Sequence, residues 1–329
     1  MNSKRHRSYI IYLLFLILQT GCIHEYPNGS GNDPNNPINA NIEISFDLRW
    51  DNMLYEMKRD ITRGREERPH RFIIEAAQNG VVVCRDTSYL ASDDFANGIV
   101  RHKLSRPLRP QYYQLAVWYD VVPEGRGNSF FNAEDLTRLT VSSTSVMNSD
   151  SIQCAFGSVD FDLKEYKGKS GANVVKEVTL QHPGGKFEII ATDIQDFIAN
   201  RREELFQGER YSLSLMLNEG NPYSFNSYSG RVDYMSESRE RRGAFLIPFG
   251  DYSELKIADG YVFCASEDII SMTLTLYNSS LMAVTKTDLF SFPVKRGFIT
   301  RVKGDFLTHP IDGPVTIDPQ WEGEIIVEL

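Results

Sequence analysis

The feature that most constrains this chain lies at residues 4–22, where the residue order is that of a bacterial export signal. Three basic residues precede an apolar run at residues 9–18, and small residues then lead to Cys22. This order predicts a secretory signal peptide over residues 1–21, and a cysteine at its end predicts a lipoprotein that is acylated on Cys22. The apolar run is shorter than the roughly 20 residues that a membrane-spanning helix needs. A signal peptide with an incidental cysteine is the alternative, because Gln19 stands where lipoprotein signals usually carry leucine.

The exported chain is acidic. Residues 1–21 hold three of the 35 Lys and Arg residues and none of the 44 Asp and Glu residues, which leaves 32 basic against 44 acidic residues and a net charge of −12. Such a charge excludes a nucleic-acid partner, which requires a basic face. The length that follows Cys22 is enough for two domains of ordinary size.

Three further cysteines, Cys84, Cys154 and Cys264, follow Cys22 in the sequence. An odd number allows at most one disulfide among them. Cys84 and Cys264 end short apolar, strand-like runs, where a cysteine most often acts as a small apolar residue. The sequence leaves open whether any two of the three form a disulfide.

Residues 22–41 predict a flexible linker, because proline, glycine and asparagine dominate and cannot bury a core. Alternating apolar residues then open a first folded region, which we predict over residues 42–172. Asn79-Gly80 is a hairpin turn signal within it. Strands are predicted at residues 42–48, 71–76, 81–85, 99–104, 111–120, 136–141 and 152–163.

A polar, glycine-bearing segment at residues 164–172 predicts a boundary, and residues 173–329 are predicted to form a second domain. Pro183-Gly184-Gly185 predicts a turn near its start. Strands of this domain are predicted at residues 174–180, 186–190, 211–217, 270–276 and 298–305.

One short helix is predicted after Thr192, which would form a capping box with Gln195, and Gly208 would end the helix. Many short strands, frequent turns and a single helix together predict an all-β fold. We therefore expect two tandem antiparallel β-sandwich domains, with the short helix in the second.

No motif for catalysis, nucleotide binding or metal binding is present, and the histidines are scattered. The sequence therefore predicts a non-enzymatic protein with no cofactor or metal site. Tyr223, Phe225 and Tyr228 cluster in a polar segment and could stack on sugars, whereas packing within the loop is the alternative.

The sequence given ends on an alternating apolar segment in which Ile325, Val327 and Leu329 share one face. Such a strand either pairs within its own sheet or is offered to a partner by strand exchange. The sequence does not decide between these two alternatives.

Three stretches of the chain form a recognisable series: residues 113–120 with Tyr-x-Leu-x-x-Trp-Tyr-Asp, residues 178–183 with Val-Thr-Leu-Gln-His-Pro, and residues 292–323 with Phe-Pro-Val near the start and Trp321 near the end. Through these stretches, in this order, the chain resembles the Bacteroides-type fimbrial anchor lipoproteins, the minor-fimbrium anchor family. It departs from the family at Gln19, His182 and Gly297, where leucine, arginine and asparagine are common.

The resemblance implies two transthyretin-like sandwiches and a lipid on Cys22. It also implies a surface-exposed position at the base of a fimbrium, where the protein would attach the shaft to the outer membrane and limit its length. The fimbrial shaft subunit would be its partner, joined by β-strand donation. A second interpretation is a surface lipoprotein that binds glycans for a nutrient-uptake system, and it depends on the exposure of Tyr223, Phe225 and Tyr228.

Overall fold

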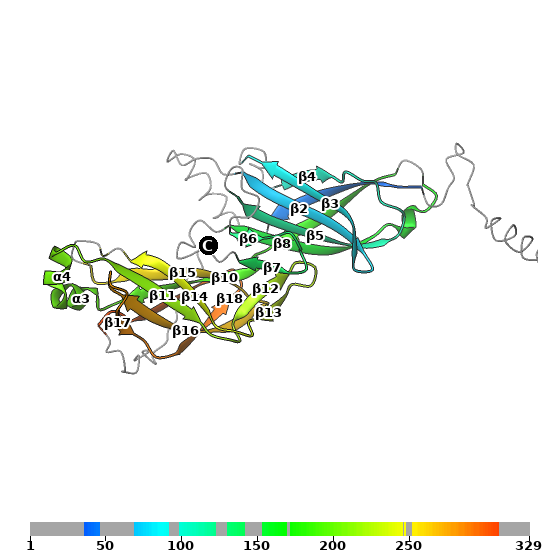
Figure 1. Cartoon of the computed structure of the whole chain (residues 1–329). Coiled ribbons are helices and arrows are strands. Elements are labelled where there is room, and N and C mark those ends of the chain that lie inside the picture. The colour runs from blue at the N-terminus through cyan, green and yellow to red at the C-terminus, as the bar shows by residue number, and fades with distance from the viewer. Residues whose placement is uncertain are drawn as a thin grey trace, which may run out of the picture.

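The computed structural model describes residues 36–46, 69–91, 99–122, 130–141, 153–169, 172–245, 247 and 252–308 of the 329-residue chain. The described residues form two β-sandwiches, at the upper right and the lower left of Figure 1. No helix among these residues is long and apolar enough to cross a membrane. Cys22, Ile325, Val327 and Leu329 lie outside the described residues, so their predicted roles stay predictions.

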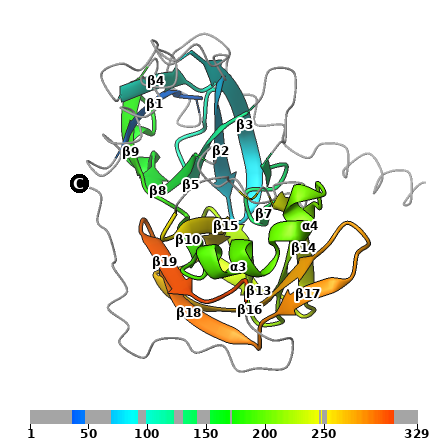
Figure 2. The ribbon, with the colours of Figure 1, turned by 90° about the vertical axis from the view of Figure 1, so that its left-hand side faces the viewer.

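The first sandwich packs a three-stranded sheet of order β4-β1-β9 against a four-stranded sheet of order β3-β2-β5-β8. Figure 2 shows the two sheets as separate layers around one core. The strands are β1 (Asn39–Phe46), β2 (His70–Gln78), β3 (Val81–Leu90), β4 (Ile99–Lys103), β5 (Tyr112–Val121), β8 (Cys154–Asp162) and β9 (Asn173–Leu180).

The second sandwich has the same construction, with one sheet of order β15-β10-β19 and one in which β14, β11, β16 and β18 are neighbours. Strand β17 (Ala283–Lys286) also pairs with part of β16. The other strands are β10 (Gly184–Ala191), β11 (Tyr211–Leu217), β14 (Arg239–Phe245), β15 (Leu255–Phe263), β16 (Glu267–Tyr277), β18 (Phe290–Lys295) and β19 (Ile299–Gly304).

Both sandwiches therefore repeat one seven-strand topology. If the strands of either copy are lettered A to G, the two sheets have the orders D-A-G and C-B-E-F. In each copy the first and last strands pair in parallel, β1 with β9 and β10 with β19, while the other pairs are antiparallel. The predicted all-β fold of tandem β-sandwiches is confirmed.

Two hairpins are inserted into this repeated topology, one in each sandwich, and together they form a third sheet. Strands β6 (Phe131–Asn132) and β7 (Leu139–Val141) belong to the first half of the chain, and β12 (Pro222–Asn226) and β13 (Arg231–Tyr234) belong to the second. The order is β13-β12-β7-β6, so the pairing of β12 with β7 joins the two halves (Figure 1). We call this the junction sheet.

Strand β9 belongs to the first sandwich, because its eight residues pair in parallel with β1. The predicted domain boundary at residue 172 stays a prediction. Strand β1 begins at Asn39, within the predicted linker, because Ile38 and Ala40 extend its buried face.

The predicted turn at Pro183-Gly184-Gly185 is wrong, since both glycines lie in β10. They are required there by close packing: a Cβ on Gly184 would lie 1.9 Å from the carbonyl oxygen of Val262, and one on Gly185 would lie 2.4 Å from that of Lys295. A side chain at either position would force two strands apart.

The predicted helix is present as two short pieces, α3 (Ile194–Asn200) and α4 (Arg202–Phe206), and Gly208 follows them with a φ of +83°. The predicted capping box is wrong. The Thr192 hydroxyl donates to Asp305 at 2.6 Å, and the Gln195 amide donates to the Tyr252 carbonyl at 3.1 Å.

Asp193 occupies the N-cap position of α3 instead, without a side-chain capping bond. Its carboxylate accepts the backbone N–H groups of Leu307 at 2.9 Å and Thr308 at 2.6 Å. The residue before the helix therefore fixes the chain that leaves β19.

Candidate functional site at the junction of the two sandwiches

An aromatic cluster fills the space between the sandwiches around Phe225 of β12. The Phe225 ring is fully buried, stacks on Phe263 of β15 at a centroid distance of 5.4 Å, and meets the edge of Phe156 of β8 at 4.6 Å. On the other side, Trp118 of β5 packs against Phe131 of β6 at 5.2 Å. Both halves of the chain thus contribute to one continuous apolar contact.

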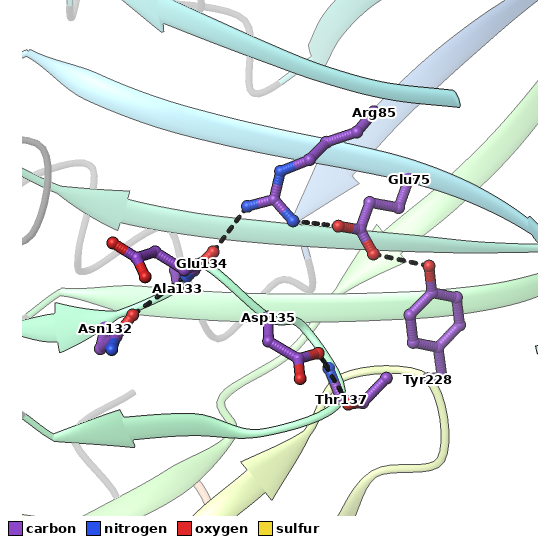
Figure 3. Close-up of polar contacts among 8 residues, drawn as sticks. All are labelled: Glu75, Arg85, Asn132, Ala133, Glu134, Asp135, Thr137 and Tyr228. Carbon is purple, nitrogen blue, oxygen red and sulfur yellow. Dashed lines mark hydrogen bonds and ion pairs between the residues drawn. The ribbon is translucent and has the colours of Figure 1, made fainter. Parts of the chain in front are cut away.

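A buried carboxylate links the same two halves through polar contacts (Figure 3). Glu75 of β2 is 2% exposed and forms an ion pair with Arg85 of β3. It also accepts a hydrogen bond from the hydroxyl of Tyr228 at 2.7 Å, and Arg85 donates to the carbonyl of Ala133 at the same distance. Burial and the neighbouring Glu75 hold the pKa of Tyr228 above its ordinary value, so its hydroxyl stays protonated as the donor.

Arg296, in the turn after β18, contacts residues of both halves of the chain at the junction. Its guanidinium donates to the carbonyl oxygens of Cys264 at 2.9 Å and Gly230 at 3.1 Å. It also lies over the rings of Phe156 and Phe225, at 5.2 and 5.7 Å from their centroids. The Arg296 guanidinium therefore contacts three chain segments: the residue after β15, the β12–β13 hairpin and strand β8.

The described cysteines settle the open question about disulfides, because Cys84, Cys154 and Cys264 are all buried and free. Burial raises the pKa of each thiol, in the case of Cys264 to about 12. Thiols of this kind are inert structural groups.

One polar cluster on the first sandwich contains the residue types of a hydrolase triad. His102 lies 2.9 Å from Asp86, but the Ser105 hydroxyl donates to Asp86 as well and does not contact the imidazole. Burial alone would raise the pKa of Asp86, yet the hydrogen bonds from Ser105 and His102 lower it below its ordinary value. The imidazole therefore cannot activate the hydroxyl in this arrangement.

The three aromatic residues considered for sugar stacking do not form an exposed platform. Phe225 is buried in the junction, Tyr228 donates to Glu75, and Tyr223 is half-buried beneath Arg239, whose guanidinium lies 4.0 Å from its ring centroid. The interpretation of these residues as an exposed sugar-binding platform is therefore wrong. Their segment pairs with β7, and this pairing places them against the rest of the protein. Among the described residues, no group of three or more His, Cys, Asp or Glu side chains is placed to hold a metal ion.

The fold and the junction define a class: a protein built mainly of β-strands, whose two like sandwiches share one sheet and one aromatic cluster. The chain belongs to a family of unknown function, DUF6562, whose sequence model matches residues 34–329. No curated protein matches it.

Several solved structures are similar in fold. The fimbrial anchor protein Mfa2 from Porphyromonas gingivalis shares 12% identity at a TM-score of 0.46, over 84% of this chain and 95% of that chain. A fimbrial assembly protein from Parabacteroides distasonis ATCC 8503 shares 14% at a TM-score of 0.37, over 81% and 90%. The tip fimbrial protein Mfa3 from Porphyromonas gingivalis, with a C-terminal truncation, shares 8% at 0.35, over 81% and 94%. The resemblance seen in the sequence thus has a counterpart among solved structures of similar fold.

Proposed function

We propose that the chain is a non-enzymatic fimbrial subunit that is anchored by lipid on Cys22. It attaches the base of a fimbrium to the outer membrane and limits the length of the shaft. Its partner is the fimbrial shaft subunit, and the two are joined by exchange of a β-strand. The segment that carries Ile325, Val327 and Leu329 is our candidate for that strand.

The observation that carries this proposal is the junction. A subunit under tension must pass force from one domain to the next without a weak hinge. Here the strand pairing of β12 with β7 and the partly buried Glu75–Tyr228 hydrogen bond cross between the halves, and only residues 181–183 separate β9 from β10. The junction is therefore a structural connection and leaves no long flexible link between the sandwiches.

The residue pattern before the folded part supports the lipid anchor. The apolar run at residues 9–18 is too short to span a bilayer, so lasting attachment would require acylation at Cys22. A single acyl chain gives only marginal attachment, whereas several chains hold a protein stably. The net negative charge of the exported chain keeps its folded part away from anionic membrane surfaces.

Substitution of Cys22 by alanine tests the anchor. We expect Cys22→Ala to move the protein from the outer-membrane fraction to the soluble fraction, and fimbriae to detach from cells, because the apolar run at residues 9–18 is too short to span a bilayer. Cys84→Ala is the matched control, since its thiol is buried in the first sandwich. If Cys22→Ala stays with the outer membrane, the lipid anchor is wrong. If it is released while cells keep firmly attached fimbriae, the anchoring role is wrong.

A further inference from the structure

A pocket lies at the end of the second sandwich that faces the junction. Its walls are mostly apolar and come from both halves of the chain, since Val141 of β7 lines it together with residues of the second sandwich. Two arginines of β14, Arg239 and Arg241, also line it. The apolar part of the wall includes Leu217, Met235, Val262 and Ile270.

Arg241 occupies a strand position that normally carries an apolar side chain. It is paired with Leu215 of β11, which is buried in the sandwich core, and it shares a face of β14 with the buried Phe245. The alternate residues Glu240 and Arg242 lie on the opposite face, where they form an ion pair with each other. Packing of the core therefore does not explain why an arginine occupies this position.

Arg241 has no counter-charge within the described chain. No hydrogen bond or ion pair joins the guanidinium of this half-buried residue to another described residue, and the charge that acts on it is the like charge of Arg239. Burial, reinforced by Arg239, lowers the pKa of Arg241 below its ordinary value. A desolvated charge without a partner is costly, so the native fold keeps a group that destabilises it.

Two other polar residues of the wall, Asn221 and Glu240, are already engaged. The Asn221 amide donates to the carbonyl oxygens of Asn218 at 2.9 Å and Ser271 at 2.7 Å, and its oxygen accepts the Ser271 backbone N–H at 2.8 Å. Glu240 also lines the pocket, but its carboxylate lies on the opposite face of β14, where it accepts from Ser214 at 2.6 Å and from Arg242. The charged groups that remain for a ligand are therefore two guanidinium groups, beside a mostly apolar surface that includes Tyr223 and Tyr261.

We propose that this pocket binds a carboxylate carried on an apolar stem, with Arg241 and Arg239 holding the carboxylate and the apolar wall holding the stem. Guanidinium groups bind carboxylates through paired, charge-assisted hydrogen bonds. A sugar acid fits less well, because its ring hydroxyls would face apolar side chains and lose their hydrogen bonds to water. Two sources share the proposed chemistry: a small aliphatic acid and the acidic side chain of a protein partner. The inference is independent of the fimbrial role.

Calorimetric titration of the full-length protein in detergent tests the proposal, with pentanoate as the probe and pentanamide as its uncharged match. We expect pentanoate to bind with one-to-one stoichiometry and pentanamide to bind at least tenfold more weakly. Arg241→Met should weaken pentanoate binding at least tenfold, and it should also raise the midpoint of thermal unfolding because it removes an unpaired charge. Arg242→Met, on the outer face of the same strand, should bind pentanoate as the wild type does.

Two further arms complete the test. Arg241→Lys keeps a charge but loses the planar fork, and we expect it to fold and to bind pentanoate several-fold more weakly. The second arm uses an acetylated and amidated Ala-Glu-Ala peptide, with its glutamine analogue as the uncharged control. Tighter binding of the glutamate peptide than of pentanoate assigns the site to a protein partner. Tighter binding of pentanoate than of the glutamate peptide assigns the site to a small acid. The proposal is overturned if pentanoate binds no better than pentanamide, if Arg241→Met and Arg242→Met bind alike, or if glucuronate binds more tightly than pentanoate.

Discussion

At the scale of single residues, the first sandwich carries polar side chains at positions where its strands are buried. Arg71 and Asp120 form a buried pair with two hydrogen bonds, of 2.7 and 2.5 Å, and burial raises the pKa of Asp120 despite them. Next to this pair, His70 is 3% exposed and its Nδ1 lies 3.0 Å from the hydroxyl of Tyr119. Burial lowers the pKa of His70 to about 4.

The buried histidine makes stability depend on pH. The imidazole of the unfolded chain takes up a proton near pH 6.5, whereas that of the folded protein stays neutral down to about pH 4. The unfolded state therefore binds more protons in this window, and the free energy of unfolding falls as the pH drops from 6.5 to 4, by at most about 3 kcal/mol from this group. Denaturant titrations should show this loss in the wild type and a smaller one in His70→Gln. Equal losses in the two proteins would contradict the assignment.

At the scale of secondary-structure elements, the strand pairing across the junction comes from two inserted hairpins, while the shared strands of the sandwiches contribute side chains to it. Strands β6 and β7 are short, and β7 pairs with β12 at only two positions, Phe225 with Leu139 and Ser224 with Thr140. The aromatic cluster adds to this pairing: the hairpins contribute Phe131 and Phe225, and the sandwich strands contribute Trp118, Phe156 and Phe263.

Removal of the central ring should therefore uncouple the two sandwiches. Phe225→Ala leaves a cavity in a fully buried site, which typically costs about 3–5 kcal/mol. We expect differential scanning calorimetry to show one cooperative transition for the wild type and two separate transitions for this variant. The control is Phe290→Ala, in the core of the second sandwich, which should lower the stability without the same separation. A single transition for Phe225→Ala would show that other contacts hold the halves together.

Much of this element structure could be predicted from the sequence, because one-sided burial leaves an alternating pattern. The strands at residues 211–217 and 270–276 are such cases, and both lie where the pattern places them. Strand β5 differs, since Trp118 and Ala116 on its second face are buried under the junction. The apolar character of these two side chains, on the face of β5 that points away from the sandwich core, is the sequence signal that a further layer covers the first sandwich.

The polar contacts of the junction could not be predicted in the same way. A regular hairpin at Asn79-Gly80 would place Glu75 opposite Cys84, but a bulge between Ala76 and Ala77 shifts the register and places it opposite Arg85. The contact of Tyr228 with Glu75 joins positions 153 residues apart. Neither the bulge nor such a distant contact leaves a periodic trace in the sequence.

At the scale of the whole molecule, two copies of one topology lie in tandem with very little chain between them. The second copy is complete at β19, since its seven strands repeat the order of the first. Residues after 308 are therefore not needed to complete the shared topology. Helices α3 and α4 lie at the end of the second sandwich that is remote from the first (Figure 1).

The proposed strand exchange can be tested on the apolar face formed by Ile325, Val327 and Leu329. We expect Val327→Asp to leave the protein folded and membrane-bound but to prevent incorporation of the shaft subunit, because a charge would enter an apolar contact. Ile326→Asp, on the opposite face of the segment, is the matched control and should still support shaft assembly. Fimbriae of ordinary number on cells with Val327→Asp would contradict a role for this face, and unfolding of that variant would favour pairing within its own sheet.

The parallel pairing of β1 with β9 has a mechanical consequence. The chain enters the first sandwich at the start of β1 and leaves it at the end of β9, so the entry and exit points lie at opposite ends of one strand pair. A pull between these two points shears the strand pair lengthwise and loads all of its interstrand hydrogen bonds at the same time. An antiparallel pair pulled at neighbouring ends would instead break its hydrogen bonds one at a time. The geometry that closes the sandwich thus also orients it to resist stretching along its own axis.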